Sequence, residues 1–334
     1  MASIRDVAQQ AGVSPMTVSR VLNGGYPVKD STRRRVLAAV KSLDYEPNLH
    51  GRGLRQARSR TVLVAGSGFV EPILDGIHKS AGELGYEVVL VHSPPQRADP
   101  AALSRRVRGG LAGGILFLNM IDEDAIRTLT ALHPVVQCGS AAEVPGTCTV
   151  TVDEERAAYE LVERLMRQGR RRVAYVAMDL PGGPPSMTRR REQGIRRALA
   201  AQGLALEPER LVRMTHLRDD YAPALDLARR FAAMPEDVRP DAVVYDQNIL
   251  AVACVNVLRE AGLAVPGSVA VASMDDNPID LVIQPTLTAV GRPYKAMGEE
   301  AMRMLVDRIE NPEAPCRQVV FRHILEMRGS TEPA

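Results

Sequence analysis

The sequence lacks long apolar runs and paired cysteines. No apolar stretch approaches the roughly 18 residues that a membrane-spanning helix needs, which argues against a membrane protein. No apolar signal region follows Met1, so we expect a cytoplasmic protein. The cysteines form no C-x-x-C pair and have no histidines at ligand spacing, which argues against a zinc site and favours reduced thiols. These cysteines are Cys138, Cys148, Cys254 and Cys316.

Common catalytic signatures are also missing. The chain has no P-loop, no G-x-S-x-G and no H-E-x-x-H, and its six histidines stand singly. A candidate strand is followed by Gly66-Ser67-Gly68, as in a dinucleotide fold. However, Glu71 occupies the third glycine position, and the next candidate strand does not end in the acid that binds a ribose. We therefore expect no enzyme, no catalytic residue, no cofactor and no metal, with a dehydrogenase as the disfavoured alternative.

The charges that are present divide unevenly along the chain. A length of 334 residues predicts two or three domains, and 45% apolar with 25% charged residues is typical of a globular protein. Residues 1–60 hold eleven Lys or Arg against four Asp or Glu, whereas the remainder holds 31 against 36. A basic head on a mildly acidic body is typical of nucleic-acid binding at one end. A basic face that is simply solvated is the alternative.

The basic head has the pattern of three short helices. Ser3 and Asp6 predict a helix start, and Gly12 predicts its end. Ser14 and Pro15 suit the first positions of a second helix, and a third is expected from about Asp30 to Asp44. Inward positions are Ile4, Val7, Ala8, Ala11, Val18, Val21, Leu22, Val36, Val40 and Leu43. The first two helices predict a helix-turn-helix whose second helix enters a major groove, with a generic three-helix bundle as the alternative.

Residues 4–23, IRDVAQQAGVSPMTVSRVLN, closely resemble the opening of the lactose-repressor (LacI/GalR) family. The resemblance continues through Tyr45–Asn48, Gly169–Val173, Arg191–Gly194, Asp275-Asp276 and Pro285–Thr288. It implies that Pro15, Met16, Arg20 and Leu54 face bases, and that Ser14, Thr17, Ser19 and Asn23 face phosphates. Arg20 can hold a guanine with two hydrogen bonds, which is worth about 1–3 kcal/mol of discrimination.

A hinge segment is expected at residues 47–60, after a DNA-binding domain at 1–46. The resemblance implies that residues 48–56 become helical on the operator, with Leu54 wedged into the minor groove. Nine residues are too few for a stable isolated helix, and Gly51 and Gly53 weaken it by about 1 kcal/mol each. A flexible basic linker is the alternative.

Residues 61–334 alternate candidate strands and helices, which predicts parallel sheets covered on both faces. Strands are expected at 61–65, 87–91, 114–118, 135–137, 172–177, 242–245, 269–273 and 319–322, and helices at 72–84, 98–109, 123–132, 154–168, 188–202, 220–233, 247–261 and 294–310. The pattern runs twice. The resemblance implies two α/β lobes of periplasmic-binding-protein type, with crossovers near residues 153, 290 and 318. The lobes would be approximately 61–153 with 291–318, and 154–290 with 319–334.

An effector site is expected between the lobes, where the carboxyl ends of strands converge. The resemblance nominates Phe69, Arg191, Tyr245, Asp246 and Asp275. The expected effector is a sugar or sugar acid, with a nucleoside or another small metabolite as alternatives. A structural ion pair is the other interpretation of Arg191 and Asp275.

Together these features predict a homodimeric transcription regulator, most often a repressor in this family. It would bind a pseudo-palindromic operator in double-stranded DNA under the control of a small effector. A solute-binding protein that feeds a transporter is one alternative, and a sugar-processing enzyme fused to a DNA-binding head is another. The helix-turn-helix and the missing catalytic motifs disfavour them.

Overall fold

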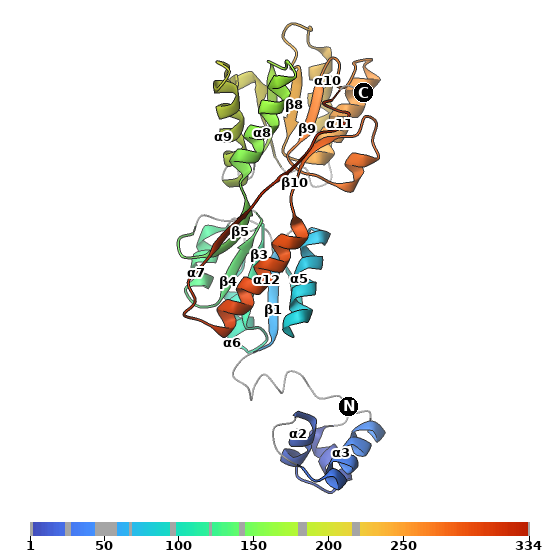
Figure 1. The fold of residues 1–334 in the computed structure, drawn as a ribbon, viewed down its shortest axis with the longest axis vertical. Coiled ribbons are helices and arrows are strands. Elements are labelled where there is room, and N and C mark those ends of the chain that lie inside the picture. Colours follow the sequence, from blue (N-terminus) through green and yellow to red (C-terminus); the bar gives the residue numbers. More distant parts are fainter. Residues whose placement is uncertain are drawn as a thin grey trace. The chain divides into compact units, whose positions relative to one another are not determined.

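The chain forms two compact units, Met1–Ser59 and Arg60–Ala334. The computed structural model describes residues 3–23, 28–43, 59–66, 69–93, 98–119, 122–139, 144–179, 186–215 and 221–332. The first unit is helical, and the second contains two β-sheets with helices on both sides of each (Figure 1). This is the helix-turn-helix head and two-lobed α/β body that the sequence predicts. Within the described residues, no helix is both long and apolar enough to cross a bilayer.

Local side-chain chemistry defines the helices in the described part of the head: α1 (Ile4–Ala11), α2 (Pro15–Asn23) and α3 (Asp30–Ser42). Ser3 and Asp6 form a capping box, in which the Asp6 amide donates to Ser3 Oγ at 3.3 Å and the Ser3 amide donates to Asp6 Oδ2 at 2.7 Å. Gly12 ends α1 in the left-handed region, at a φ of 60° that a glycine adopts without strain. These short-range interactions turn the chain sharply from α1 into α2.

A small apolar core holds the three helices together. Its fully buried members are Val7, Ala8, Ala11, Val18, Val36 and Ala39, and Ile4, Val21, Leu22, Val40 and Leu43 pack around them. Gln10 Nε2 also donates to Ser42 Oγ at 2.7 Å, which joins the end of α1 to the end of α3. The outer face of α2 is thereby left exposed.

The first lobe is built on a sheet with the strand order β11-β5-β4-β3-β1-β2. Its strands are β1 (Thr61–Gly66), β2 (Glu87–His92), β3 (Gly114–Leu118), β4 (Val135–Cys138), β5 (Cys148–Val152) and β11 (Gln318–Phe321). All pairs in this sheet are parallel. Its faces are covered by α5 (Glu71–Leu84) and α12 (Tyr294–Glu310) on one side, and by α6 (Pro100–Arg108) and α7 (Glu123–Thr130) on the other.

The second lobe repeats this arrangement with the strand order β12-β10-β9-β8-β6-β7. Its strands are β6 (Val173–Asp179), β7 (Leu211–Thr215), β8 (Ala242–Tyr245), β9 (Ala270–Ser273), β10 (Thr288–Gly291) and β12 (Ile324–Glu326), of which only β12 is antiparallel. The helices α8 (Glu154–Arg167) and α9 (Ser186–Ala200) cover one face, and α10 (Ala222–Ala233) and α11 (Asn248–Glu260) cover the other. Two 3₁₀ turns, η1 (Pro208–Arg210) and η2 (Pro278–Leu281), complete it.

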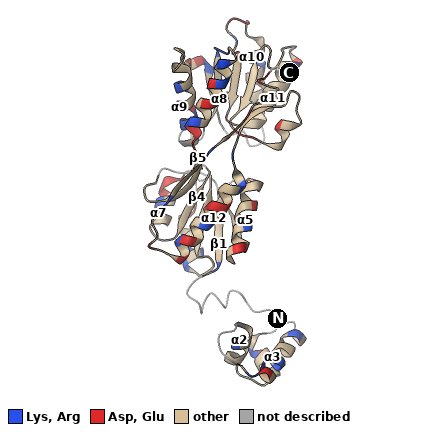
Figure 2. Cartoon of the chain, viewed as in Figure 1, with Lys and Arg blue, Asp and Glu red and all other residues tan. Residues whose placement is uncertain are grey.

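Charged residues are absent from several central strands and lie on the helices that cover the sheets. Strands β1, β3, β4, β8 and β9 contain no charged residue, as expected where a strand is buried on both faces. Lys, Arg, Asp and Glu stand on the helices that cover the sheets (Figure 2). Gly194 lets α9 approach α8 closely, because a Cβ at this position would overlap the carbonyl oxygen of Glu155. The start of α8 is therefore held directly against α9.

The chain passes between the lobes three times. It leaves β5 for α8 at Asp153, leaves β10 for α12 at Arg292 and Pro293, and leaves β11 for β12 at Arg322 and His323. The third crossover therefore falls later than the expected position near residue 318, because β11 pairs with β5 in the first sheet. Strands β5, β7, β10 and β12 are not among the strands expected from the sequence, and each is defined by its pairing with a neighbouring strand.

Candidate functional site

The exposed face of α2 is the candidate DNA-reading surface. Met16 is 63% exposed, and Arg20 Nη2 lies 3.6 Å from Met16 Sδ, so the two side chains form one surface. Ser14 caps the helix, because its Oγ accepts from the Thr17 amide at 3.2 Å and lies 3.0 Å from Thr17 Oγ1. Four of the predicted DNA contacts, Ser14, Met16, Thr17 and Arg20, thus stand on this turn-and-helix surface. It combines a flexible thioether, a guanidinium and small hydroxyls.

Two predicted DNA contacts cannot be placed in this way. Leu54, the proposed hinge helix at 48–56 and the glycines within it lie outside the described residues. Asn23 ends α2, and its side chain also lies outside them. Their roles rest on the sequence.

In the body, Arg191 is the centre of a buried cluster of charges. It projects from α9 with only 2% of its side chain exposed. Its Nε donates to Glu154 Oε2 at 2.7 Å, and its Nη1 donates to Asp246 Oδ1 at 3.0 Å. The guanidinium is therefore already paired with two carboxylates, one from the start of α8 and one from the end of β8.

Asp246 is saturated with hydrogen bonds. Besides Arg191, its carboxylate accepts from the Met178 amide at 2.8 Å, from Thr188 Oγ1 at 2.9 Å and from the hydroxyl of Tyr175. Only 1% of the Asp246 side chain is exposed. This carboxylate orients Arg191 and has little capacity left for a ligand.

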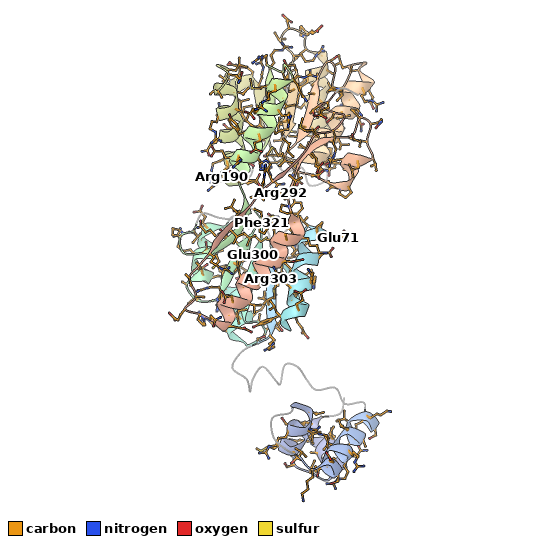
Figure 3. All side chains as sticks on the ribbon, viewed as in Figure 1. Glu71, Arg190, Arg292, Glu300, Arg303 and Phe321 are labelled. Atoms are coloured by element: carbon orange, nitrogen blue, oxygen red, sulfur yellow. The ribbon has the colours of Figure 1, made fainter. Side chains whose placement is uncertain are left out.

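Glu154 joins Arg191 to a second buried arginine, Arg292. The Nη2 of Arg292 lies 3.0 Å from both carboxylate oxygens of Glu154, and its Nε donates to Oε1 at 3.1 Å. Glu154 follows the first crossover, and Arg292, labelled in Figure 3, lies on the second. The ion pair therefore connects two of the three segments that pass between the lobes.

The cluster ends at the most accessible of its carboxylates. Arg292 Nη1 donates to Asp275 Oδ1 at 3.1 Å, and the hydroxyl of Tyr294 donates to the same oxygen at 2.7 Å. Asp275 follows β9, and 37% of its side chain is exposed. An open surface cavity of about 510 Å³ lies beside Arg292 and Tyr294 and is bordered by Pro72 and Glu299. Asp275 is not among the residues that line this cavity, and its exposed fraction makes it the most accessible charged residue of the predicted site.

The pKa values in the cluster follow from burial and pairing. Burial alone would raise the pKa of Glu154, but the adjacent Arg191 and Arg292 overcome it and hold the pKa below its ordinary value. Burial would lower the pKa of Arg191, yet Glu154 and Asp246 raise it well above the ordinary value. Burial raises the pKa of Tyr294. The directions of these pKa shifts leave Glu154 and Arg191 charged and Tyr294 neutral at neutral pH. The cluster contains two arginines and three carboxylate side chains, one more acidic group than basic.

The remaining predicted effector residues lie apart from this cluster. Tyr245 is 1% exposed and packs with Leu250 and Cys254 in the core under α11. Phe69 is partly buried against the first-lobe core, next to the start of α5. The prediction missed Glu154, Arg292 and Tyr294. A usable signal was their position within four residues of the crossovers expected near residues 153 and 290.

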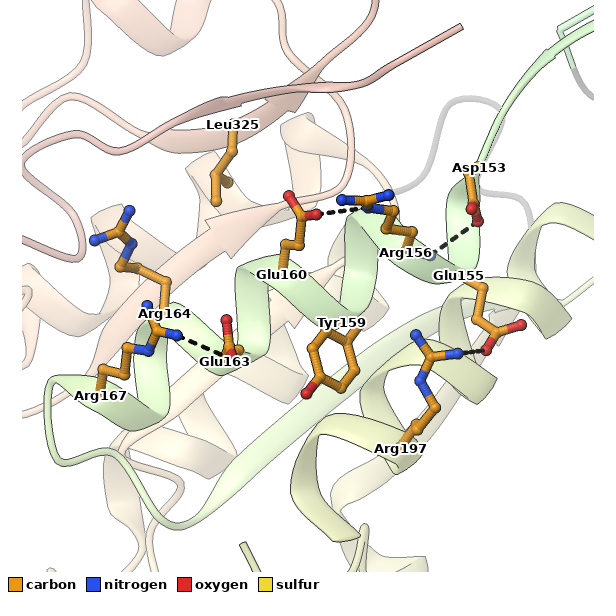
Figure 4. A pocket seen from close by; sticks show the side chains of 10 residues that line it. All are labelled: Asp153, Glu155, Arg156, Tyr159, Glu160, Glu163, Arg164, Arg167, Arg197 and Leu325. Atoms are coloured by element: carbon orange, nitrogen blue, oxygen red, sulfur yellow. Dashed lines mark hydrogen bonds and ion pairs between the residues drawn. The ribbon is translucent and has the colours of Figure 1, made fainter. Parts of the chain in front are cut away.

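A second cavity, of about 500 Å³, lies on the outer face of α8 (Figure 4). Six of its charged side chains form three ion pairs: Arg156 with Glu160 at 2.7 Å, Arg167 with Glu163 at 3.2 Å, and Arg197 with Glu155. The Arg197 guanidinium also lies 4.8 Å from the centre of the Tyr159 ring. Such exposed pairs contribute little free energy. The acidic and basic groups balance, so this surface is a weaker candidate for a charged ligand.

Each of the two units contains a segment that matches a known protein family. Residues 3–48 match the model of bacterial regulatory proteins of the lacI family, and residues 162–331 match a periplasmic binding protein-like domain. The HTH-type transcriptional regulator CelR of Thermobifida fusca is 33% identical, over 96% of this chain and 95% of the relative.

Two solved structures resemble the whole chain. One, of a transcriptional regulator CelR–cellobiose complex, is 29% identical with a TM-score of 0.71, over 99% of this chain and all of that one. The other, of the lac repressor dimer bound to operator and an anti-inducer, is 23% identical with a TM-score of 0.83, over 99% of each chain. The second likeness concerns the fold.

Proposed function

Because the chain belongs to the lacI family of bacterial regulatory proteins, we propose that it is a cytoplasmic, homodimeric transcription repressor controlled by a sugar. The family consists of regulators and not of enzymes. The observation that carries the DNA half of the proposal is the exposed surface of Met16 and Arg20 on α2. Arg20 would read a guanine, Met16 and Pro15 would contact thymine methyl groups, and Ser14, Thr17, Ser19 and Asn23 would approach phosphates.

The effector would bind at the exposed end of the charge cluster. Asp275 can accept hydrogen bonds from hydroxyl groups, and Tyr294 and Arg292 hold it in place. Arg191 would not contact the effector and would instead hold Glu154 and Asp246 in position. A ligand that drew Glu154 or Arg292 into new contacts would shift the crossover segments to which these residues belong. The position of one lobe relative to the other would change as a result.

The charge balance of the cluster favours a neutral sugar over a sugar acid. Both arginines are paired with carboxylates, and Asp275 adds a further negative charge at the accessible end. An anionic ligand would have to displace one of these carboxylates, whereas sugar hydroxyls can donate to Asp275 directly. The related CelR was solved with cellobiose, a neutral sugar, which is in keeping with this choice.

A dimer contact is proposed at the end of the second lobe. Leu281 and Val282 are 61% and 79% exposed, and Ile249 and Ile279 are each 37% exposed. Asn248 Nδ2 lies 3.4 Å from Asp280 Oδ1, so these apolar side chains from α11 and η2 are neighbours. A second copy of the chain is the proposed occupant, because two copies are needed to match a pseudo-palindromic operator.

The proposal is tested in two steps with the full-length protein. Selection from a random duplex pool should return a two-fold symmetric site, and binding to it should be measured against a scrambled duplex. A thermal-shift screen should then compare neutral sugars, the matching sugar acids and nucleosides. A ligand at a hundred times its Kd stabilises by about 2.7 kcal/mol. Stabilisation by a neutral sugar, together with release of the selected duplex, is expected. Failure to enrich any site would overturn the proposal, and a response to sugar acids alone would overturn its choice of effector.

A further inference from the structure

The four cysteines occupy different environments. Cys138 and Cys254 are fully buried in the cores of the first and second lobes. Cys316 is exposed, and Cys148, which is buried at the start of β5, lies against it. The two sulfur atoms are 2.7 Å apart although 168 positions separate the residues, with the Cys148 thiol donating to Cys316 Sγ.

The backbone on both sides of this pair is held in register. Cys316 lies two residues before β11, which runs parallel to β5 with Gln318 opposite Thr149. The Thr149 amide donates to the carbonyl oxygen of Arg317 at 3.0 Å, immediately beside the two cysteines. A covalent S–S bond is about 2.05 Å long. The sulfur atoms can therefore bond with a displacement of well under 1 Å, and neither strand has to leave the sheet.

We propose that Cys148 and Cys316 form an oxidant-responsive site that closes into an intramolecular disulfide when a hydroperoxide reaches Cys316. The Cys316 sulfur attacks one peroxide oxygen, the O–O bond breaks, and the other oxygen leaves with a proton as water or an alcohol. The Cys148 sulfur then attacks the resulting sulfenic sulfur. Its S–O bond breaks, and hydroxide leaves with the Cys148 proton as water. Two thiols are oxidised and one peroxide is reduced.

The different environments of Cys316 and Cys148 suit them to the first and second steps of this reaction. Cys316 is open to solvent, which the first step requires. Burial, followed by the contact with Cys316, raises the pKa of Cys148 to about 11, so this thiol stays protonated and shielded until its partner is oxidised. Burial raises the pKa of Cys138 and of Cys254 to about 12, which keeps both outside the reaction.

The disulfide would act on the third crossover. β11 is an edge strand, paired with β5 alone within the described sheet, and it leads directly to Arg322 and His323. Edge strands open more readily than central strands. A covalent link at the start of β11 would hold the strand on β5, so amide exchange of residues 318–321 should slow when the protein is oxidised.

The test is titration of the full-length protein with hydrogen peroxide, followed by intact mass, thiol counting and mapping of the linked peptides. The expected product lacks two hydrogens, retains two free thiols, carries one Cys148–Cys316 link and shows slower exchange over 318–321. Dithiothreitol should reverse every change. The matched variant Cys138→Ala/Cys254→Ala should form the same link.

Two further variants separate the steps. Cys316→Ser, at an exposed position, should keep the unfolding temperature of the reduced parent and form no intramolecular link. Cys148→Ala should leave Cys316 as a sulfenic acid that dimedone captures. The proposal is overturned if the parent protein accumulates Cys316 sulfinic acid while Cys148 stays a thiol, or if Cys316 links only to other chains.

Discussion

The carboxylate of Glu154 lies 2.7 Å from the Nε of Arg191 and holds α9 to the first residue of α8. Because Glu154 also pairs with Arg292, one buried carboxylate joins two arginines from separate segments. Without the charge of this carboxylate, Arg191 would keep only Asp246 and Arg292 only Asp275, and the buried ion pairs that Glu154 makes with both guanidinium groups would be lost. Breaking a buried ion pair is far more costly than removing an exposed one.

Glu154→Gln is therefore expected to destabilise the protein by roughly 3 kcal/mol or more, since the amide keeps the volume but loses the charge. Chemical denaturation, followed by circular dichroism, measures this free energy. The control Glu163→Gln removes an exposed partner of Arg167 and should cost less than about 1 kcal/mol. Equal losses in the two variants would contradict the structural role of Glu154.

The free energy of unfolding of Glu154→Gln and that of the parent protein should also depend differently on pH in acid. The pKa of Glu154 is lowered in the folded state, so its stabilisation is complete above the ordinary value of 4.5 and is lost as the pH falls toward the lowered value. Glu154→Gln lacks this contribution and should lose stability less steeply below pH 4.5 than the parent. Parallel curves would mean that Glu154 does not carry the lowered pKa.

Asp275→Asn is expected to weaken effector binding by about tenfold or more, because a hydrogen bond to a charged group contributes about 1.5–3 kcal/mol. Operator affinity in the absence of effector should not change. Calorimetry with the sugar found by screening measures the first quantity, and anisotropy with labelled operator measures the second. Asp226→Asn, at an exposed pair with Arg229, is the control. Unchanged sugar affinity in Asp275→Asn would exclude this carboxylate from the site.

Arg20→Ala should reduce the preference for the operator over a scrambled duplex by about 1–3 kcal/mol, while weak, salt-sensitive binding to any duplex remains. Anisotropy titrations at several salt concentrations separate these two contributions. Arg34→Ala, on α3, removes the same charge from the head and should lower binding to both duplexes alike. The assignment of Arg20 to base reading fails if its variant ranks the duplexes as the parent does.

Leu54→Ala is expected to weaken operator binding without changing sugar affinity, since the resemblance to the family implies a leucine wedge in the minor groove at this position. The two affinities should be measured as for Asp275→Asn. The neighbouring Arg52→Ala removes a charge and leaves the wedge. If Arg52→Ala lowers operator affinity as much as Leu54→Ala does, the segment contributes through charge alone.

If the chain forms the proposed dimer, Val282→Asp is expected to convert it into monomers, because it places a charge in the proposed apolar contact. Sedimentation velocity over a range of concentrations measures the change. Val238→Asp alters a valine that is 52% exposed elsewhere on the second lobe and should remain dimeric. A dimeric Val282→Asp protein would place the contact on another surface.

Local sequence determined the head and the layering of the body. The Ser3–Asp6 capping box, the left-handed Gly12 and Pro15 at the first position of α2 all act within a few residues of one another. Buried strands and amphipathic helices carry their own periodicity, so the alternation of strand and helix was evident from the sequence. These features depend on neighbours along the chain.

Only the tertiary structure decided which charges meet. The sequence left Arg191 as either a ligand contact or half of an ion pair with Asp275, whereas in the structure it pairs with Glu154 and Asp246, 37 and 55 positions away. Asp275 pairs with Arg292 instead, and Glu154 reaches Arg292 across 138 positions. The short strands β5, β7, β10 and β12 were also decided in this way, as was the sheet to which β11 belongs. In each case the free energy comes from a partner that is distant in sequence, so no local pattern records it.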